Sequence, residues 1–334
     1  MQGMPNRSGR IGGMAGQLEG AHHSEEMVRL ETEYASAITA LKQTEIITLL
    51  PQSEVLGVIG IDGEEYPAPS FAQLLEIIER NKDLVDAKWR QGFTRLQMTP
   101  IAMPAPRLID CAIAAILKHA AAGTILQTKP NPTDADIPVR VNTAKPFWIW
   151  ERLRQALDTP KVVYFPQVYS PQDHLGLTKE EVARDARFCA VPGWSVGLIE
   201  PIPIMPGQGQ GRVIGGRKEL EEYSTPRDYL LTLSAPAYQG ETGWTPEDFL
   251  AHFTTQLEST DQISHDRYDG NALWLLGMYV PNVMPSSGDE RYKMQLVPVG
   301  YWARDAGRKL YLTTHRTGNR LKSCVARTAV RLSG

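Results

Sequence analysis

The chain ends in the stretch SCVARTAVRL, residues 323–332, whose apolar and polar side chains alternate towards the end. A period of two is typical of a β-strand with one buried and one solvent-facing side. Free chain ends fray unless other elements hold them, so a strand in this position is expected to close a sheet. The stretch therefore predicts a C-terminal domain whose sheet is completed by its last strand.

Upstream of this strand the pattern indicates an α+β fold. From residue 263 onward the helical period disappears, whereas Thr245, followed by Pro246 and two acidic residues, is a typical helix N-cap. Helices are expected at residues 147–157, 224–233 and 245–260. Short strands are expected at residues 139–143, 161–169, 272–281, 292–303 and 308–316.

The N-terminal part is expected to be mainly helical. Its helical period predicts one helix from the N-cap Ser24 to Pro51, a second from Ser70, and a third that follows Pro106 and ends at Gly123. None of these helices shows paired carboxylates, a nucleophile or a basic stripe, so this part is expected to be a tether or an oligomerisation element. The expected organisation is a disordered tail at residues 1–20, a helical N-terminal module at 21–130 and an α+β domain at 136–334.

Composition argues against several functional classes. The 35 Lys and Arg residues nearly balance the 38 Asp and Glu residues, which argues against nucleic-acid binding. No apolar stretch approaches the roughly 18 residues of a membrane span, and no signal peptide is recognisable. A cytoplasmic protein is therefore expected, with surface display by another route left open. The three cysteines lie far apart and predict neither disulfides nor a metal site, and no cofactor is expected.

The pentapeptide GWSVG, residues 193–197, matches the G-x-S-x-G motif that presents a nucleophilic serine, here Ser195, in α/β-hydrolases. That motif requires a helix directly after it, and Pro201, Pro203 and Pro206 prevent one. We therefore interpret the segment as an apolar strand that accepts small residues. No sequence pattern identifies His252, His265 or His315 as the catalytic base that such a serine would need.

Two other patterns resemble a phosphate-binding loop and a metal site, but the residues around them do not complete either motif. The Gly-rich segment 207–218 has no G-K-[ST] ending, so a flexible or ligand-covering loop is expected in place of a phosphate loop. The pairs His22–His23 and Asp173–His174 could supply metal ligands, but a metal site needs three or four convergent groups. Solvated surface is the expectation for both pairs.

Residues 265–323 are unusually rich in Tyr, Trp, Arg, His, Asn, Thr and Ser. Such a mixture is typical of an antibody-like binding surface, where rigid aromatic side chains give contact area and short polar ones adapt their hydrogen bonds. An ordinary loop region that happens to be aromatic is the alternative that composition leaves open.

The segment GYWARDAGRKLYLTTHRTGNRLKSCVARTAVRL, residues 300–332, resembles the C-terminal end of the C-type-lectin-fold variable proteins of diversity-generating retroelements. In those proteins a Trp–Asp-type strand, a short Leu-bearing strand, a variable loop and a final strand follow one another. The pieces here are YWARDAG, KLYLTT, HRTGNRLKS and VARTAVRL. Formylglycine-generating enzymes share the fold and a similar ending, and the resemblance covers residues 136–334.

The resemblance implies a C-type lectin-like domain in which the first and last strands pair, so that residues 139–143 lie beside residues 328–332. It implies a variable binding face within residues 265–323 that recognises a protein or other macromolecule without catalysis, metal or cofactor. The side chains expected to line this surface are Tyr301, Arg304, Tyr311, Thr313, His315, Arg316, Asn319 and Arg320. Those expected to border it are Tyr268, Asn271 and Trp274.

Two catalytic alternatives remain beside the binding function. A copper-dependent oxidase of the formylglycine-generating type would need Cys189 and Cys324 to meet in space, although neither occupies the paired position of that family. A serine hydrolase would act through Ser195.

Overall fold

The computed structural model describes residues 28–129, 133–201, 205–266, 272–283, 294–304 and 307–334, and these form an α+β fold. The helices are residues 28–43, α2 (Phe71–Arg80), α3 (Lys82–Arg90), α4 (Ala105–Ala122), α5 (Glu151–Ala156), α6 (Lys179–Arg184), α7 (Pro226–Leu233) and α8 (Pro246–Thr260). The first strands are β1 (Thr48–Leu49), β2 (Leu56–Ile59), β3 (Glu65–Pro67), β4 (Arg95–Thr99), β5 (Phe147–Ile149), β6 (Val163–Tyr164), β7 (Ser195–Ile199) and β8 (Val213–Ile214). The later strands are β9 (Arg217–Lys218), β10 (Glu241–Gly243), β11 (Ala272–Trp274), β12 (Met278–Val283), β13 (Met294–Ala303), β14 (Lys309–Arg316), β15 (Cys324–Ala326) and β16 (Thr328–Arg331). Among the helices so described, none is long and apolar enough to cross a membrane.

Local chemistry sets the ends of several helices. Thr225 with Asp228 at the start of α7, and Thr245 with Asp248 at the start of α8, form reciprocal capping boxes. Each box satisfies backbone N–H groups that have no partner within the helix. Gly123 ends α4 with a φ of 70°, a conformation that glycine adopts without strain. The N-cap predicted at Thr245 and the C-terminal glycine predicted at Gly123 are confirmed.

The first helix is shorter than the sequence predicts. It stops at residue 43, and Glu45 then has a φ of 54°, which a helix cannot accommodate. Ile46 and Ile47 extend the helical period in the sequence, but both are buried beyond the helix end. The segment that follows forms the three-stranded sheet β1–β2–β3, so the N-terminal part contains strands as well as helices.

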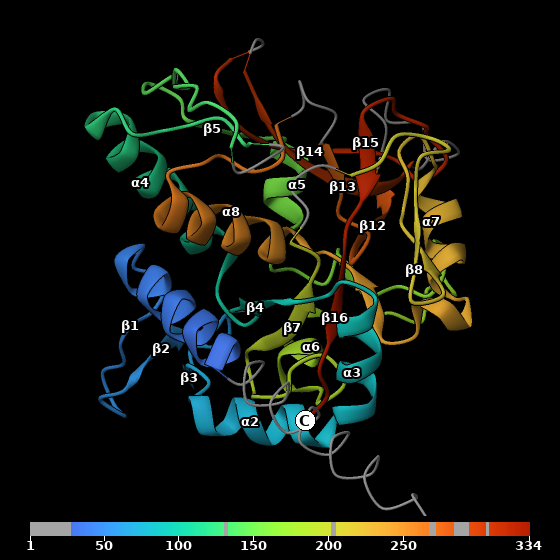
Figure 1. Ribbon diagram of the computed structural model, residues 1–334, viewed down its shortest axis with the longest axis horizontal. Helices are drawn as coiled ribbons and strands as arrows, with labels where there is room; N and C mark the ends of the chain where they lie inside the picture. Colours follow the sequence, from blue (N-terminus) through green and yellow to red (C-terminus); the bar gives the residue numbers. More distant parts are fainter. Residues whose placement is uncertain (1–27, 130–132, 202–204, 267–271, 284–293, 305–306) are drawn as a thin grey trace, which may run out of the picture.

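The last strand lies inside a four-stranded sheet of order β10–β16–β7–β4 (Figure 1). Ala329 pairs with Thr242 on one side, and Arg331 pairs with Gly197 on the other. The expected pairing with residues 139–143 is wrong, because both edges of β16 are occupied and that segment forms no strand. The expected solvent-facing side is also wrong, because all four residues of β16 are buried.

The N-terminal and C-terminal parts of the chain share this sheet. β4 pairs with β7 over five residue pairs, and α4 packs against α8. The buried apolar side chains form one core that extends from Leu30 to Leu332. The division expected near residue 130 therefore does not separate two independent cores.

A second sheet is built around β13. β14 pairs with one edge of β13 and continues to β5, whereas β11 and β12 pair with the other edge, followed by β15 and β6. α8 contacts both β4 and β13, and in Figure 1 it runs between the two sheets. Gly300 of β13 lies directly against the ring of Phe249 of α8, so one face of β13 is covered by this helix. The opposite face of β13 and β14 carries the candidate binding residues.

Candidate functional site

Three aromatic side chains from three strands form a row on the outer face of the second sheet. Tyr311 of β14 pairs in register with Tyr301 of β13 and with Trp148 of β5. The two tyrosine rings stack with centroids 5.2 Å apart and planes 3° from parallel, and the Trp148 ring lies 5.4 Å from that of Tyr311. All three side chains are half-buried. Because register fixes the spacing of cross-strand neighbours, the backbone itself aligns this row.

The same face continues along β14 with Thr313 and His315, since alternate residues of a strand point to one side. Their partners on β13, Val299 and Val297, are buried. The His315 ring packs edge-on against Trp274 of β11, with centroids 6.0 Å apart. We define the aromatic face as Trp148, Tyr301, Tyr311, Thr313 and His315.

The inner side of these strands is apolar and firmly packed. Leu310 and Leu312 of β14 are fully buried. Trp302 of β13 stacks on Phe253 of α8 with ring centroids 6.0 Å apart and planes 9° from parallel. The aromatic face therefore rests on a well-packed support, which lowers the entropy cost of contact with a partner.

Arg304, which follows β13, has its charge satisfied within the protein. Its guanidinium forms an ion pair with Asp266, and its Nη1 donates a hydrogen bond to Oε1 of Gln127 at 2.7 Å. Asp266 is completely buried. Arg304 therefore supports the edge of the sheet, and its side chain is only 26% exposed.

The remaining predicted side chains lie at the end of β14 and in the turn beyond it. The backbone N–H of Asn319 donates to the carbonyl of Arg316 at 3.0 Å and so closes this turn. Arg320 lies 3.6 Å from Asp228 of α7, and both side chains are more than half exposed. Exposed pairs of this kind contribute little to stability, so Arg320 can exchange Asp228 for a binding partner. Arg316 is exposed as well and can also contact a partner.

Two further predictions have different outcomes. Trp274 was expected to border the surface, but its side chain is completely buried, and the His315 ring packs against it. Tyr268 and Asn271 lie outside the described residues.

Trp148 is the member of the aromatic face that the sequence did not indicate. The segment FWIW was expected to begin a helix, yet it forms β5, with Phe147 and Ile149 buried and Trp148 half-buried between them. The alternation within FWIW is the signal that could have identified it.

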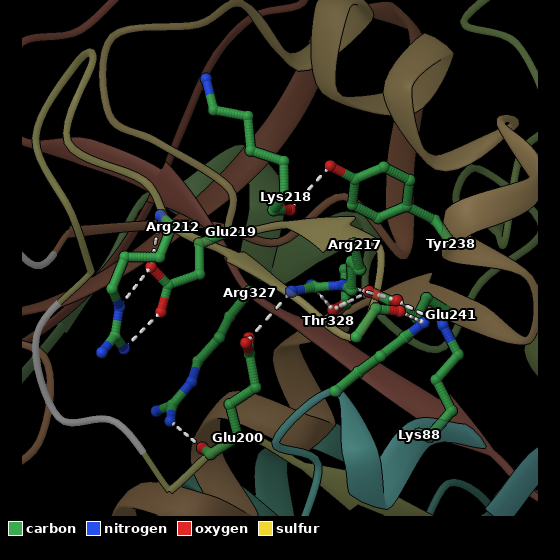
Figure 2. Close-up of polar contacts among 12 residues, drawn as sticks. Lys88, Glu200, Arg212, Arg217, Lys218, Glu219, Tyr238, Glu241, Arg327 and Thr328 are labelled. Carbon is green, nitrogen blue, oxygen red and sulfur yellow. Dashed lines mark hydrogen bonds and ion pairs between the residues drawn. The ribbon is translucent and has the colours of Figure 1, made fainter.

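A buried ion cluster beside the four-stranded sheet holds the start of the last strand (Figure 2). Arg217 of β9 binds Glu241 of β10 through Nε at 2.7 Å and Nη2 at 2.8 Å, and its Nη1 lies 3.1 Å from Glu200. Lys88 of α3 and Thr328 of β16 also bind Glu241, each at 2.7 Å. All five side chains are buried. Burial raises the pKa of Glu200, and the positive charges of Arg217 and Arg327 oppose that rise.

The Gly-rich segment supplies this cluster with its central arginine. β8 and β9 form a hairpin in which Gly215 and Gly216, with φ of 55° and 80°, are the two turn residues. Positive φ at both positions is characteristic of a type I′ turn, a common two-residue hairpin turn. The expectation of a flexible loop is therefore wrong for residues 213–218, because the hairpin places Arg217 between Glu200 and Glu241.

Ser195 of the GWSVG motif lies within β7 and is 1% exposed. Its hydroxyl accepts a hydrogen bond from Nη1 of Arg331. A Cβ atom at Gly197 would lie 2.7 Å from the carbonyl oxygen of Val330, so this glycine allows β7 and β16 to approach. Packing accounts for the motif, and the apolar strand predicted for this segment is confirmed.

The cysteines show no redox or metal arrangement in the part of the chain that the structure covers. Cys111, Cys189 and Cys324 are buried and form no disulfide. Burial raises the pKa of Cys189 to about 12, which disfavours the reactive thiolate. No group of three or more potential metal ligands occurs among the described residues.

The aromatic face thus combines a row of half-buried rings with a hydroxyl group and an imidazole, and exposed arginines lie at its end. Such a surface offers contact area and groups that can form hydrogen bonds with a partner. Comparisons with protein-family models, with curated proteins and with solved structures give no match for this chain.

Proposed function

We propose that the chain is a non-catalytic binding protein whose aromatic face recognises a protein or other macromolecule. The observation that carries this proposal is the aligned row of Trp148, Tyr311 and Tyr301 on one rigid sheet. Aromatic side chains dominate the energetics of many protein interfaces, because they give large contact area and lose few rotamers on binding. Arg316 and Arg320 would contribute polar contacts at the rim.

We further propose that this scaffold is of the C-type lectin-like type and that its outer side chains are diversified by a retroelement. The sequence resemblance at residues 300–332 supports this, as does a division of labour within β14. Leu310 and Leu312 hold the strand in the core, whereas Tyr311, Thr313 and His315 can change without loss of that packing. The DNA next to the gene tests this proposal. If it contains neither a reverse-transcriptase gene nor a copy of the last coding segment that differs at adenines, the retroelement is excluded. The chain would then be a binding protein whose surface is not diversified.

A crosslinking experiment on the full chain tests the binding function. A photoreactive phenylalanine analogue replaces Tyr311 in one preparation and Leu231, which is 74% exposed on α7, in another. Both proteins are illuminated in extract of the cells that naturally make them. We expect one macromolecule to be captured from position 311 and not from position 231.

The captured molecule is then purified, and its Kd is measured for three variants. Tyr301→Ala and Tyr311→Ala should each raise Kd at least about tenfold, as truncation of a central aromatic contact does. Leu231→Ala should leave Kd unchanged. Equal binding by all three variants would show that the aromatic face does not carry recognition.

A further inference from the structure

A small polar cavity lies where β4, α8 and the segment after α8 meet the last strands. Its volume is about 30 Å³, enough for one small ion or water molecule. The lining side chains that matter here are Arg95, Thr128, His252, Ser264, His265 and Arg327. The aromatic face uses none of them.

Two neighbouring side chains in this cavity have polar atoms without a protein partner. Oγ of Ser264 and Nε2 of His265 are buried, and neither makes a hydrogen bond within the described residues. Buried polar atoms are almost always hydrogen-bonded, so two adjacent exceptions beside one cavity point to a bound group. A hydroxyl and a ring N–H are both donors towards an acceptor placed between them.

The charges around the cavity are positive. Arg95 and Arg327 line it, and none of the described lining residues is an acid. Acids outside the lining interact with both arginines: Glu33 with Arg95, and Glu200, whose Oε1 is also bound to Arg217, with Arg327. Charge complementarity therefore favours an anion over a neutral molecule or a cation.

Burial and nearby positive charge favour the neutral form of the two histidines. Burial, followed by the charges of Arg95 and Arg327, lowers the pKa of His252 well below its usual range. Burial and Arg327 do the same to the pKa of His265. Nδ1 of His252 lies 3.3 Å from Oε1 of Gln97, so this ring is already oriented by the protein.

The backbone holds His265 in a strained conformation. Its φ is 59°, a region that non-glycine residues rarely occupy. Its carbonyl accepts a hydrogen bond from the N–H of Trp302 at 2.8 Å, and its ring packs edge-on against Trp244 at a centroid distance of 5.6 Å. Strain of this kind persists where the surroundings over-determine a residue, and such residues often belong to binding sites.

A larger cleft lies beside the cavity. It has a volume of about 450 Å³, lies between the helix at residues 28–43, β4 and α8, and shares Arg95 and His252 with the cavity. Hydroxyl groups of Thr32, Ser36 and Ser259 line it. The carboxylate of Glu33 also lines this cleft and interacts with Arg95.

From these observations we infer that the cavity is a binding site for a small monovalent anion of halide size. Ser264 and His265 donate hydrogen bonds to the ion, and the guanidinium groups of Arg95 and Arg327 supply the compensating charge. The bound ion links the segment after α8 to β4 and to the last strands, so that it stabilises the closed C-terminal end.

Bromide, which scatters anomalously, is the probe for this site in crystals of the full chain. We expect an anomalous peak within hydrogen-bond distance of Oγ of Ser264 and Nε2 of His265. In crystals of Ser264→Ala, which removes only the hydroxyl, the peak should weaken or vanish. Density without an anomalous signal, or bromide peaks only elsewhere on the surface, would overturn the proposal.

Thermal unfolding in solution gives the second readout. Sodium bromide should raise the midpoint of the wild type in a saturable manner relative to sodium gluconate, a larger anion, at equal ionic strength. The rise should be smaller for Ser264→Ala and for His265→Asn, since asparagine accepts positive φ. Ser259→Ala, which changes only the outer cleft, should respond as the wild type does. An equal response of all four proteins would reject the cavity as the site.

Discussion

Nη2 of Arg331 in the last strand lies 2.5 Å from Oδ2 of Asp248 on α8, and the two side chains are only 3% and 0% exposed. The same carboxylate accepts the backbone N–H of Thr245 at 2.8 Å and the hydroxyl of Thr99 of β4 at 2.7 Å. One buried acid therefore caps α8 and ties that helix to two strands of the four-stranded sheet. This contact explains how a strand rich in polar residues can lie inside the protein.

Asp248→Asn is expected to destabilise the protein strongly. The substitution keeps the shape of the side chain but leaves the Arg331 charge buried without its counter-ion, which costs about 3–5 kcal/mol. Urea unfolding measures the loss.

Asp228→Asn is the matched control, because Asp228 caps α7 in the same way but its side chain is 52% exposed. Loss of that cap should cost about 1 kcal/mol. Equal losses for the two variants would show that capping alone explains the role of Asp248.

The sequence predicted those features of the fold that depend on local chemistry. The capping threonine of α8, the glycine that ends α4 and the strands β13 and β14 follow from residue type and period. The resemblance named Tyr311, Thr313 and His315 as surface residues, and in the structure they are alternate residues of β14.

Contacts between distant segments could not be predicted in this way. The charged residues Arg327 and Arg331 suggested that one side of the last strand faces solvent. In the structure both are buried, because Arg327 donates to the backbone carbonyl of Glu200 and Arg331 to the carboxylate of Asp248. These partners lie 127 and 83 residues away, so the sequence does not show the pairing. The aromatic row has the same origin, since Trp148 reaches Tyr311 only through the parallel pairing of β5 with β14. Neither relationship leaves a periodic signal in the sequence.

Gly197→Ala should be destabilising by about 1–3 kcal/mol, the usual cost of an inserted methyl group in a packed interior. The new Cβ would lie 2.7 Å from the carbonyl oxygen of Val330 and would push β7 away from β16. Gly318→Ala is the control, because no atom lies within 4 Å of a Cβ there. Thermal or urea unfolding of both variants decides whether the glycine of the motif serves strand packing.

Stability should fall as the pH decreases below about 6.5, the ordinary pKa of histidine. Burial lowers the pKa values of His252 and His265 in the folded protein, so in acid the unfolded chain binds protons that the folded chain does not. Each histidine then contributes a slope of about 1.4 kcal/mol per pH unit, and the contribution is complete above pH 6.5.

Urea unfolding of the wild type and of His252→Gln between pH 5 and pH 8 checks this dependence. The difference in unfolding free energy between the two proteins should change over that range, since the variant lacks one of the two histidines. A constant difference for His252→Gln would mean that His252 titrates normally in the folded state.

The stacked pair Tyr301–Tyr311 should behave as one unit in a double-mutant cycle. Their rings are 5.2 Å apart and almost parallel, and aromatic pairs of this geometry contribute about 0.5–1.5 kcal/mol beyond the area that they bury. The losses of unfolding free energy for Tyr301→Ala and for Tyr311→Ala should therefore add up to more than the loss for the double variant. The excess should equal this coupling of about 0.5–1.5 kcal/mol. The pair Tyr301 and Thr313 lies on the same face but not in register, and its cycle should give a coupling near zero. Additive losses for the tyrosine pair would mean that the rings do not form a fixed row in solution, and the preorganised surface on which recognition depends would be absent.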